Sequence, residues 1–78
     1  MISLKFCPEI LTHYRKQKEL SFLQLARIFR AKYGQTKLNK QLVWSWERGK
    51  SVPSSKNIMI LAHIFKTNVE NFWEIEDQ

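Results

Sequence analysis

The chain has 78 residues, which is enough for one small domain and short of what two would need. Its 44% apolar and 26% charged residues are ordinary globular proportions and exclude a disordered tail, while the single cysteine, Cys7, excludes an internal disulfide and a cysteine-based metal cluster. No apolar run is long enough to cross a membrane and no signal peptide is visible, so we expect a soluble, cytoplasmic protein. We expect neither a metal nor a cofactor.

Helices are expected throughout the chain. Only two glycines and two prolines occur, which favours helices joined by short links, and we predict an all-α fold, a compact bundle of five short helices. The first is expected over residues 8–18, with proline at its first position. The second is expected over 22–33, because Ser21 and Gln24 form a capping box before it and Gly34 suits its end.

Three further helices complete the predicted bundle. The third is expected over residues 40–48 with Asn39 as its cap, the fourth after Ser54 or Ser55, and a short fifth after Asn68. Apolar residues recur at helical spacing and give the helices their inner faces. These residues are Ile10, Leu11, Tyr14, Phe22, Leu25, Ala26, Phe29, Tyr33, Val43, Trp46, Ile58, Leu61, Ala62 and Phe65.

Positive charge is concentrated in the middle third of the chain. Residues 27–50 contain seven lysines and arginines and one acid, Glu47, whereas the rest holds six bases and six acids, so the net charge of +6 lies in this window. Such a run is either a solvated face or the footprint of a polyanion. Its position in the fold decides between these interpretations.

Four segments occur in an order typical of one family. They are Leu20-Ser21-x-x-x-Leu25-Ala26, Val43-x-x-Trp46-Glu47-Arg48-Gly49-Lys50, Pro53-Ser54 and Leu61-Ala62-x-x-Phe65. Over roughly residues 11–73 the chain resembles the XRE or Cro/lambda-repressor family of helix-turn-helix DNA-binding proteins. The resemblance implies a single DNA-binding domain over residues 1–78, a lambda-repressor-like bundle whose motif helices are 22–33 and 40–48.

The resemblance also implies a function. We expect a sequence-specific double-stranded DNA-binding transcriptional regulator, a small phage- or plasmid-type repressor that binds a palindromic operator as a homodimer. The alternative is an antitoxin or another protein-interaction module of a toxin–antitoxin operon, with a toxin as partner. An enzyme is not expected, since His13 and His63 lie on separate predicted helices without a matching catalytic set. The dimer surface is expected on the last helix, unless the same residues close the core: Phe72, Trp73 and Ile75.

The third helix carries the predicted reading surface. Aligned on the family motif, the base-contacting positions and their neighbours are Asn39, Lys40, Gln41, Trp44 and Ser45. Gln41 has the chemistry to pair with adenine, and Lys40 to donate to guanine, unless both are merely solvated. The predicted phosphate contacts are Ser21, Lys32, Lys37, Arg48 and Lys50.

Two residues of the third helix invite separate interpretation. We expect Glu47 to hold a nearby cation or backbone amide rather than touch DNA, because the matching family residue is usually structural. Trp44 stands where the family usually has a small polar residue. It either packs under the preceding loop or contacts a base or sugar.

The chain departs from the family pattern between the motif helices. About eight residues, Arg30 to Lys37, are extra there. Our hypothesis is that the second helix gains one turn, that Tyr33 returns to the core, and that the basic loop with Lys32 and Lys37 lies along the DNA backbone as a clamp.

Three single positions also differ. Phe22 stands where many relatives carry a phosphate-contacting glutamine, so we expect that contact to be lost. Glu19 and Lys66 stand where relatives often have glycine at helix ends, and we expect those turns to close differently.

Overall fold

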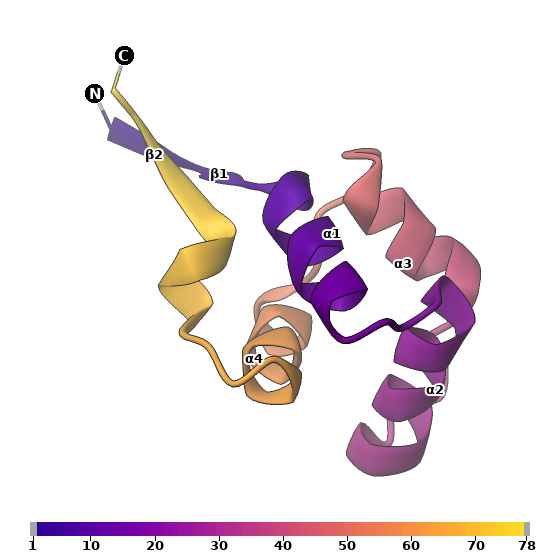
Figure 1. Ribbon diagram of the computed structural model, residues 1–78. Coiled ribbons are helices and arrows are strands. Elements are labelled where there is room, and N and C mark those ends of the chain that lie inside the picture. The colour runs from indigo at the N-terminus through magenta and orange to yellow at the C-terminus, as the bar shows by residue number, and fades with distance from the viewer. Residues whose placement is uncertain (1, 78) are drawn as a thin grey trace.

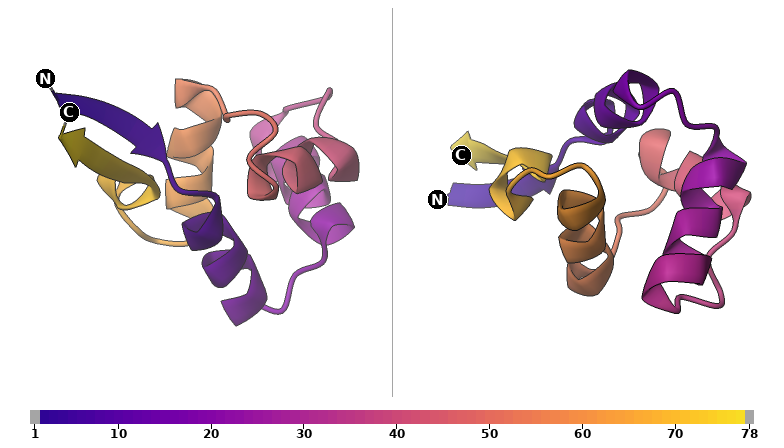
Figure 2. Two further views of the ribbon diagram at one scale, coloured as in Figure 1. Left: turned by 90° about the horizontal axis from the view of Figure 1, so that it is seen from above. Right: turned by 60° about the horizontal axis from the view of Figure 1, so that its bottom comes forward.

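The computed structural model describes residues 2–77. In this part of the chain four α-helices and one short 3-10 helix lie between two β-strands that pair with each other (Figure 1). The elements are β1 (Ile2–Phe6), α1 (Pro8–Gln17), α2 (Phe22–Tyr33), α3 (Lys40–Glu47), α4 (Ser55–Ile64), η1 (Val69–Phe72) and β2 (Trp73–Asp77). The two-stranded ribbon projects from one end of the bundle, and α2 and α3 lie at the other end (Figure 1, Figure 2).

The first two helices follow the predicted local signals. α2 spans the predicted residues 22–33: the Ser21 hydroxyl accepts from the Gln24 amide at 3.0 Å, and the Gln24 side chain accepts from the Ser21 amide at 2.8 Å. Gly34 ends the helix in the left-handed conformation, at φ +66°. α1 has proline at its first position as predicted, and it ends at Gln17.

Side chains also cap α3 and α4. The Asn39 side-chain oxygen accepts from the Leu42 amide at 2.9 Å, and the Ser54 hydroxyl accepts from the Asn57 amide at 3.2 Å. Each bond satisfies one of the backbone donors that the first turn of a helix leaves unpaired. The predicted start of α3 is therefore confirmed, and of the two serines before α4 the cap is Ser54.

The prediction of an all-α bundle of five helices is wrong. The fifth helix is a single 3-10 turn, Val69–Phe72, after which β2 pairs antiparallel with β1, placing Phe6 opposite Trp73 and Leu4 opposite Ile75. Apolar and polar residues alternate in both strands, which is the period of a strand and not of a helix. Because the two strands lie at opposite ends of the chain, no turn signal joins them. The protein is a small mixed α/β fold.

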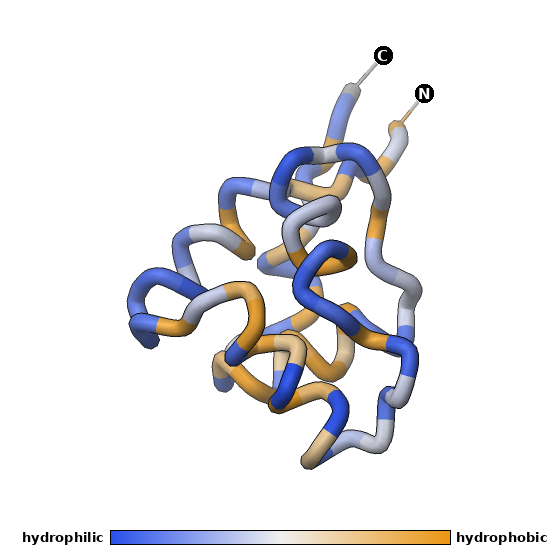
Figure 3. The backbone as a smooth tube through the Cα atoms, turned by 90° about the vertical axis from the view of Figure 1, so that its right-hand side faces the viewer, coloured by the Kyte–Doolittle hydropathy of each residue, from blue (hydrophilic) through white to orange (hydrophobic). Residues whose placement is uncertain are grey.

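The core is built by every helix and by β1. Its buried apolar side chains are Phe6, Leu11, Leu25, Ala26, Phe29, Leu38, Val43, Trp46, Ile58, Ile60, Leu61, Ala62, Phe65 and Phe72. The rings of Phe29 and Trp46 meet at 5.8 Å, which joins α2 to α3. Phe72 is fully buried, so this member of the predicted dimer surface closes the core instead. In Figure 3 hydrophobic and hydrophilic residues alternate along the helices, as amphipathic packing requires.

Two turns use the left-handed conformation without glycine. Glu19 and Lys66 have φ values of 55° and 54°. After each of them the chain folds back: the Leu20 amide donates to the Arg15 carbonyl, and the Thr67 amide donates to the Ala62 carbonyl. The expectation that these turns close differently is wrong. They close as a glycine turn does, at a cost of roughly 1 kcal/mol each for the side chain.

Within residues 2–77, no helix combines the length and the apolar character needed to cross a membrane.

Candidate nucleic-acid interface

α3 has a buried back and an exposed front. Val43 and Trp46, three residues apart, have 0% and 1% of their surface exposed. Gln41 and Trp44, on the opposite side of the helix, are exposed, and so is Lys40 at its first position. Because only the back of α3 contacts the bundle, its polar front is free to meet a partner in a groove.

Glu47 fixes the position of α3 on α1. Its carboxylate accepts two hydrogen bonds from the Arg15 guanidinium, at 2.6 and 3.0 Å, and a third from the Thr12 hydroxyl at 2.7 Å. The side chains of Arg15 and Glu47 are only 12% and 5% exposed. A third guanidinium nitrogen donates to the Leu20 carbonyl at 2.8 Å. The predicted structural role of Glu47 is therefore confirmed, and the cation that it holds is Arg15.

Phe22 covers this ion pair. The Arg15 guanidinium carbon lies 4.3 Å from the centre of the Phe22 ring, close enough for a cation–π contact. The ring stands at the first position of α2, so three helices meet at one point: α1 through Arg15, α2 through Phe22 and α3 through Glu47. The residue that departs from the family pattern thus shields the buried pair.

Trp44 lies beside two cations on the exposed side of α3. The centre of its ring is 5.6 Å from the Arg48 guanidinium carbon and 6.0 Å from the Lys50 ammonium nitrogen, and 39% of its surface is exposed. The contacts that the structure shows for the ring are thus with the cations that follow α3, and not with the loop that precedes it. Trp44, Arg48 and Lys50 together form a positively charged group around one ring, which we call the Trp44 cluster.

Two predicted base contacts also bond within the protein. The Ser45 hydroxyl lies 2.7 Å from the Ser51 hydroxyl, which ties α3 to the loop after it. The Asn39 side-chain oxygen is engaged as the α3 cap. Lys40 and Gln41, which are exposed on the first turn of the helix, are the predicted base contacts that keep their full bonding capacity.

The predicted phosphate contacts are dispersed. Arg48 and Lys50 flank Gly49, which turns the chain at φ +71° just after α3. Lys32 lies on the flank of α2 that faces α4, where it lines a hollow with His63. The remaining two stand apart: Ser21 caps α2, and Lys37 lines a hollow beside the start of α4.

A second pair of cations lies on α2, and of these Arg27 is not among the predicted phosphate contacts. Arg27 and Arg30 are both exposed and, together with Thr36 of the connecting loop, line a shallow hollow. Residues three apart lie on the same side of a helix, and this side is opposite to that of Lys32. The charge run alone could not separate them, whereas the position of each residue relative to the apolar stripe of α2 does.

The extra loop is held by its own contacts. The Gln35 amide donates to the Phe29 carbonyl at 3.1 Å, and its side chain donates to the Tyr33 carbonyl at 2.8 Å. Tyr33 is half-buried against the core, with its hydroxyl 2.6 Å from Nδ1 of His63, and Leu38 is buried. The hypothesis that α2 extends by a turn and returns Tyr33 to the core is confirmed.

The titratable groups outside α3 form no reactive cluster that the structure shows. Burial, followed by a hydrogen bond to Glu74, raises the pKa of the Cys7 thiol, which disfavours the reactive thiolate. Within residues 2–77 no three histidine, cysteine or acidic side chains lie together as metal ligands would. Neither a protein-family model, nor a curated protein, nor a solved structure matches this chain.

Proposed function

We propose that this protein binds double-stranded DNA sequence-specifically, with α3 in the major groove, and acts as a transcriptional repressor on a palindromic operator. The support comes from the residues of α3 and from the resemblance to helix-turn-helix proteins. A major groove of about 12 Å admits one helix, and its first turn reads the base edges.

One observation carries the proposal: one side of α3 is packed tightly against the bundle, while the polar side chains of its first turn are exposed. The buried Trp46 and the Arg15–Glu47 ion pair fix the helix against the bundle, while Lys40 and Gln41 are exposed on its first turn. A helix that is already rigid loses little backbone entropy on binding, so the entropic cost is confined to ordering the side chains that contact the bases.

The cations around α3 supply affinity that does not depend on sequence. Arg48 and Lys50 lie at the C-terminal end of the helix, and Arg27 and Arg30 lie on the adjoining helix. Contacts of this kind neutralise phosphates and set the register on the duplex, whereas base contacts determine the sequence.

Selection of bound fragments from a random duplex library, at stated salt, tests the proposal. We expect an enriched palindrome with half-sites about one helical turn apart. Failure to retain any duplex above background at low salt would contradict DNA binding, and enrichment without a shared sequence would contradict specificity.

A double variant then tests the reading surface. Lys40→Ala with Gln41→Ala should reduce the preference for the selected sequence by roughly 1–3 kcal/mol for each base pair that is read, and change nonspecific affinity much less. The chain offers a matched control, because Lys16 and Gln17 are also adjacent and exposed, at the end of α1. Lys16→Ala with Gln17→Ala should leave the preference unchanged.

A further inference from the structure

The outer half of the β1–β2 ribbon exposes an apolar face. Ile2 and Leu4 of β1 and Ile75 of β2 lie on one face of the ribbon and are 69%, 64% and 67% exposed. Toward the bundle the same face continues into Phe6 and Trp73, whose rings meet at 6.0 Å. The apolar face thus begins in the core and runs outward as far as Ile2, which pairs with Asp77, and the ribbon itself projects from the bundle (Figure 1).

The free edge of β1 has main-chain groups directed away from β2. The Cys7 amide donates to the Phe72 carbonyl at 2.9 Å, which places this pair in hydrogen-bonding register just inside the ribbon. Bonded and non-bonded pairs alternate along antiparallel strands, so the amide and carbonyl groups of Ile2, Leu4 and Phe6 point to the free edge. An uncovered edge of this kind is a template for another strand.

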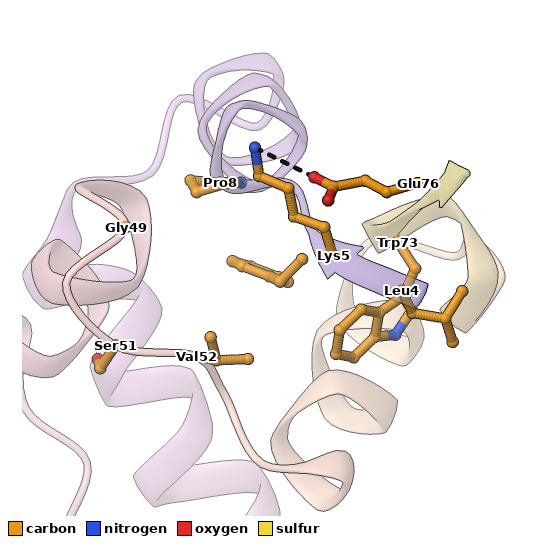
Figure 4. A pocket seen from close by; sticks show the side chains of 9 residues that line it. Leu4, Lys5, Pro8, Gly49, Ser51, Val52, Trp73 and Glu76 are labelled. Atoms are coloured by element: carbon orange, nitrogen blue, oxygen red, sulfur yellow. Dashed lines mark ion pairs between the residues drawn. The ribbon is translucent and has the colours of Figure 1, made fainter. Parts of the chain in front are cut away.

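A hollow adjoins this edge. It is lined by Leu4, Phe6 and Trp73 of the ribbon and by Val52 of the loop after α3. Figure 4 shows the side chains of Leu4 and Trp73 next to each other, with Val52 on the facing loop. Val52 is itself 60% exposed, so apolar side chains stand on both sides of the hollow. The Lys5–Glu76 ion pair, at 3.7 Å, lines it as well (Figure 4).

Charge distinguishes the two edges of the ribbon. If β2 paired with a second copy of itself about Ile75, Glu74 of each chain would lie opposite Glu76 of the other, and like charges directly opposite are destabilising. If β1 paired with itself about Leu4, Lys5 would lie opposite Ser3 and no like charges would meet. In these two registers, only the edge of β1 pairs with its own copy without placing like charges opposite each other.

We propose that a second copy of the chain binds at this edge, joined through the free edges of the two β1 strands. The strands pair antiparallel with Leu4 opposite Leu4 of the second copy, and the sheet becomes four-stranded in the order β2–β1–β1–β2. Ile2 of the second copy then lies opposite Phe6, next to the hollow. The arrangement is two-fold symmetric, as most homodimers are.

This dimer brings two copies of α3 together for one palindromic operator, and its biological role rests on the proposed DNA binding. Two recognition helices in successive major grooves lie roughly 34 Å apart, so each lies about 17 Å from the two-fold axis. The longest dimension of the molecule is 40 Å, with the ribbon and the α2–α3 pair toward opposite ends (Figure 1). A two-fold axis at β1 therefore places the two α3 helices on the outer sides of the dimer.

Proline substitution tests the edge. Leu4→Pro removes an outward amide of β1 and keeps the bonds to β2, and Ile75→Pro does the same on the outer edge of β2. Without DNA, sedimentation equilibrium should show that Leu4→Pro weakens the dimer by roughly 30-fold, since each copy loses one amide donor and the interface loses two hydrogen bonds. Ile75→Pro should leave the dimer intact. A strictly monomeric wild-type chain, or equal loss in both variants, would overturn the inference.

A crosslink tests the register independently of any loss of folding. Directly opposite residues of a bonded antiparallel pair have Cα atoms about 5.5 Å apart, which a disulfide spans. In a Cys7→Ser background, Leu4→Cys should oxidise to a covalent dimer, whereas Ile75→Cys should remain monomeric under the same conditions. Crosslinking of Ile75→Cys alone would overturn the proposed edge.

The inference and the proposed function fail separately. A chain that binds duplex DNA but forms neither the dimer nor the Leu4→Cys crosslink refutes the interface and leaves DNA binding in place. A chain that dimerises and crosslinks but ignores duplex DNA refutes the function and leaves the interface in place.

Discussion

The two ends of this molecule, the α2–α3 pair and the β1–β2 ribbon, differ in how fully they bury their apolar side chains. At the α2–α3 end most apolar side chains are packed and Phe22 covers the Arg15–Glu47 pair, while Leu23 and Trp44 are each 39% exposed. At the ribbon end Leu4 and Ile75 remain exposed. The α2–α3 end is therefore largely packed within one chain and suits a hydrated polyanion. The ribbon end leaves apolar surface exposed and gains from an apolar partner.

Removal of the Glu47 carboxylate should have the largest effect on the stability of the α2–α3 end. Glu47→Ala leaves the buried Arg15 charge unpaired and should destabilise the fold by about 3–5 kcal/mol, measured by urea unfolding. The double variant Arg15→Met with Glu47→Leu removes both charges and should recover most of that loss. If the single variant costs less than about 1 kcal/mol, the pair does not hold α3.

The ribbon itself should divide into an inner and an outer half. At low protein concentration Phe6→Ala should cost about 3 kcal/mol because the side chain is buried, whereas Leu4→Ala should change stability by less than about 0.5 kcal/mol. Thermal unfolding of both variants measures the difference. Equal costs would show that the outer half is already packed within one chain.

The salt dependence of DNA affinity identifies which cations of the α2–α3 end contact phosphates. Arg27→Ala with Arg30→Ala should reduce the slope of log affinity against log salt by about two, because each phosphate contact contributes roughly 0.9. Lys32→Ala with Lys37→Ala is the matched pair, and it tests the clamp hypothesis. Since Lys32 lies on the flank of α2 that faces α4, we expect a smaller reduction there. A larger reduction for the lysine pair would restore the clamp.

The smallest expected effect concerns the backbone. Lys66→Gly should stabilise the protein by about 1 kcal/mol, because glycine adopts the left-handed conformation without strain. Gly34→Ala is the reverse change at φ +66°, with no atom within 4 Å of the added carbon, and should cost about the same. Chemical denaturation of the two variants should therefore give shifts of opposite sign.

Local signals predicted the helices well. The Ser21–Gln24 capping box and the Asn39 cap act over three residues, so the sequence alone locates the starts of α2 and α3. The burial of Trp46 follows likewise from helical spacing. These features depend only on neighbours along the chain.

The missed features depend on residues far apart in the sequence. Trp73 and Ile75 belong to a strand and not to the predicted helix, and no local signal indicates this because their pairing partners, Phe6 and Leu4, lie at the other end of the chain. Arg15 could not be identified as the partner of Glu47, since 32 positions separate them. Helical periodicity carries no information about either contact. The DNA contacts themselves stay predictions, with Lys40 and Gln41 the best placed.

The pairing of β1 with β2 has a kinetic consequence. It closes a loop that contains every helix, and the entropy of closure grows with loop length, so the strands can join cheaply only after the helices have collapsed. The hydrogen bonds between β1 and β2 should therefore form last during folding and open first in the native state. Its amide protons should exchange with deuterated solvent well before those of α2 and α4.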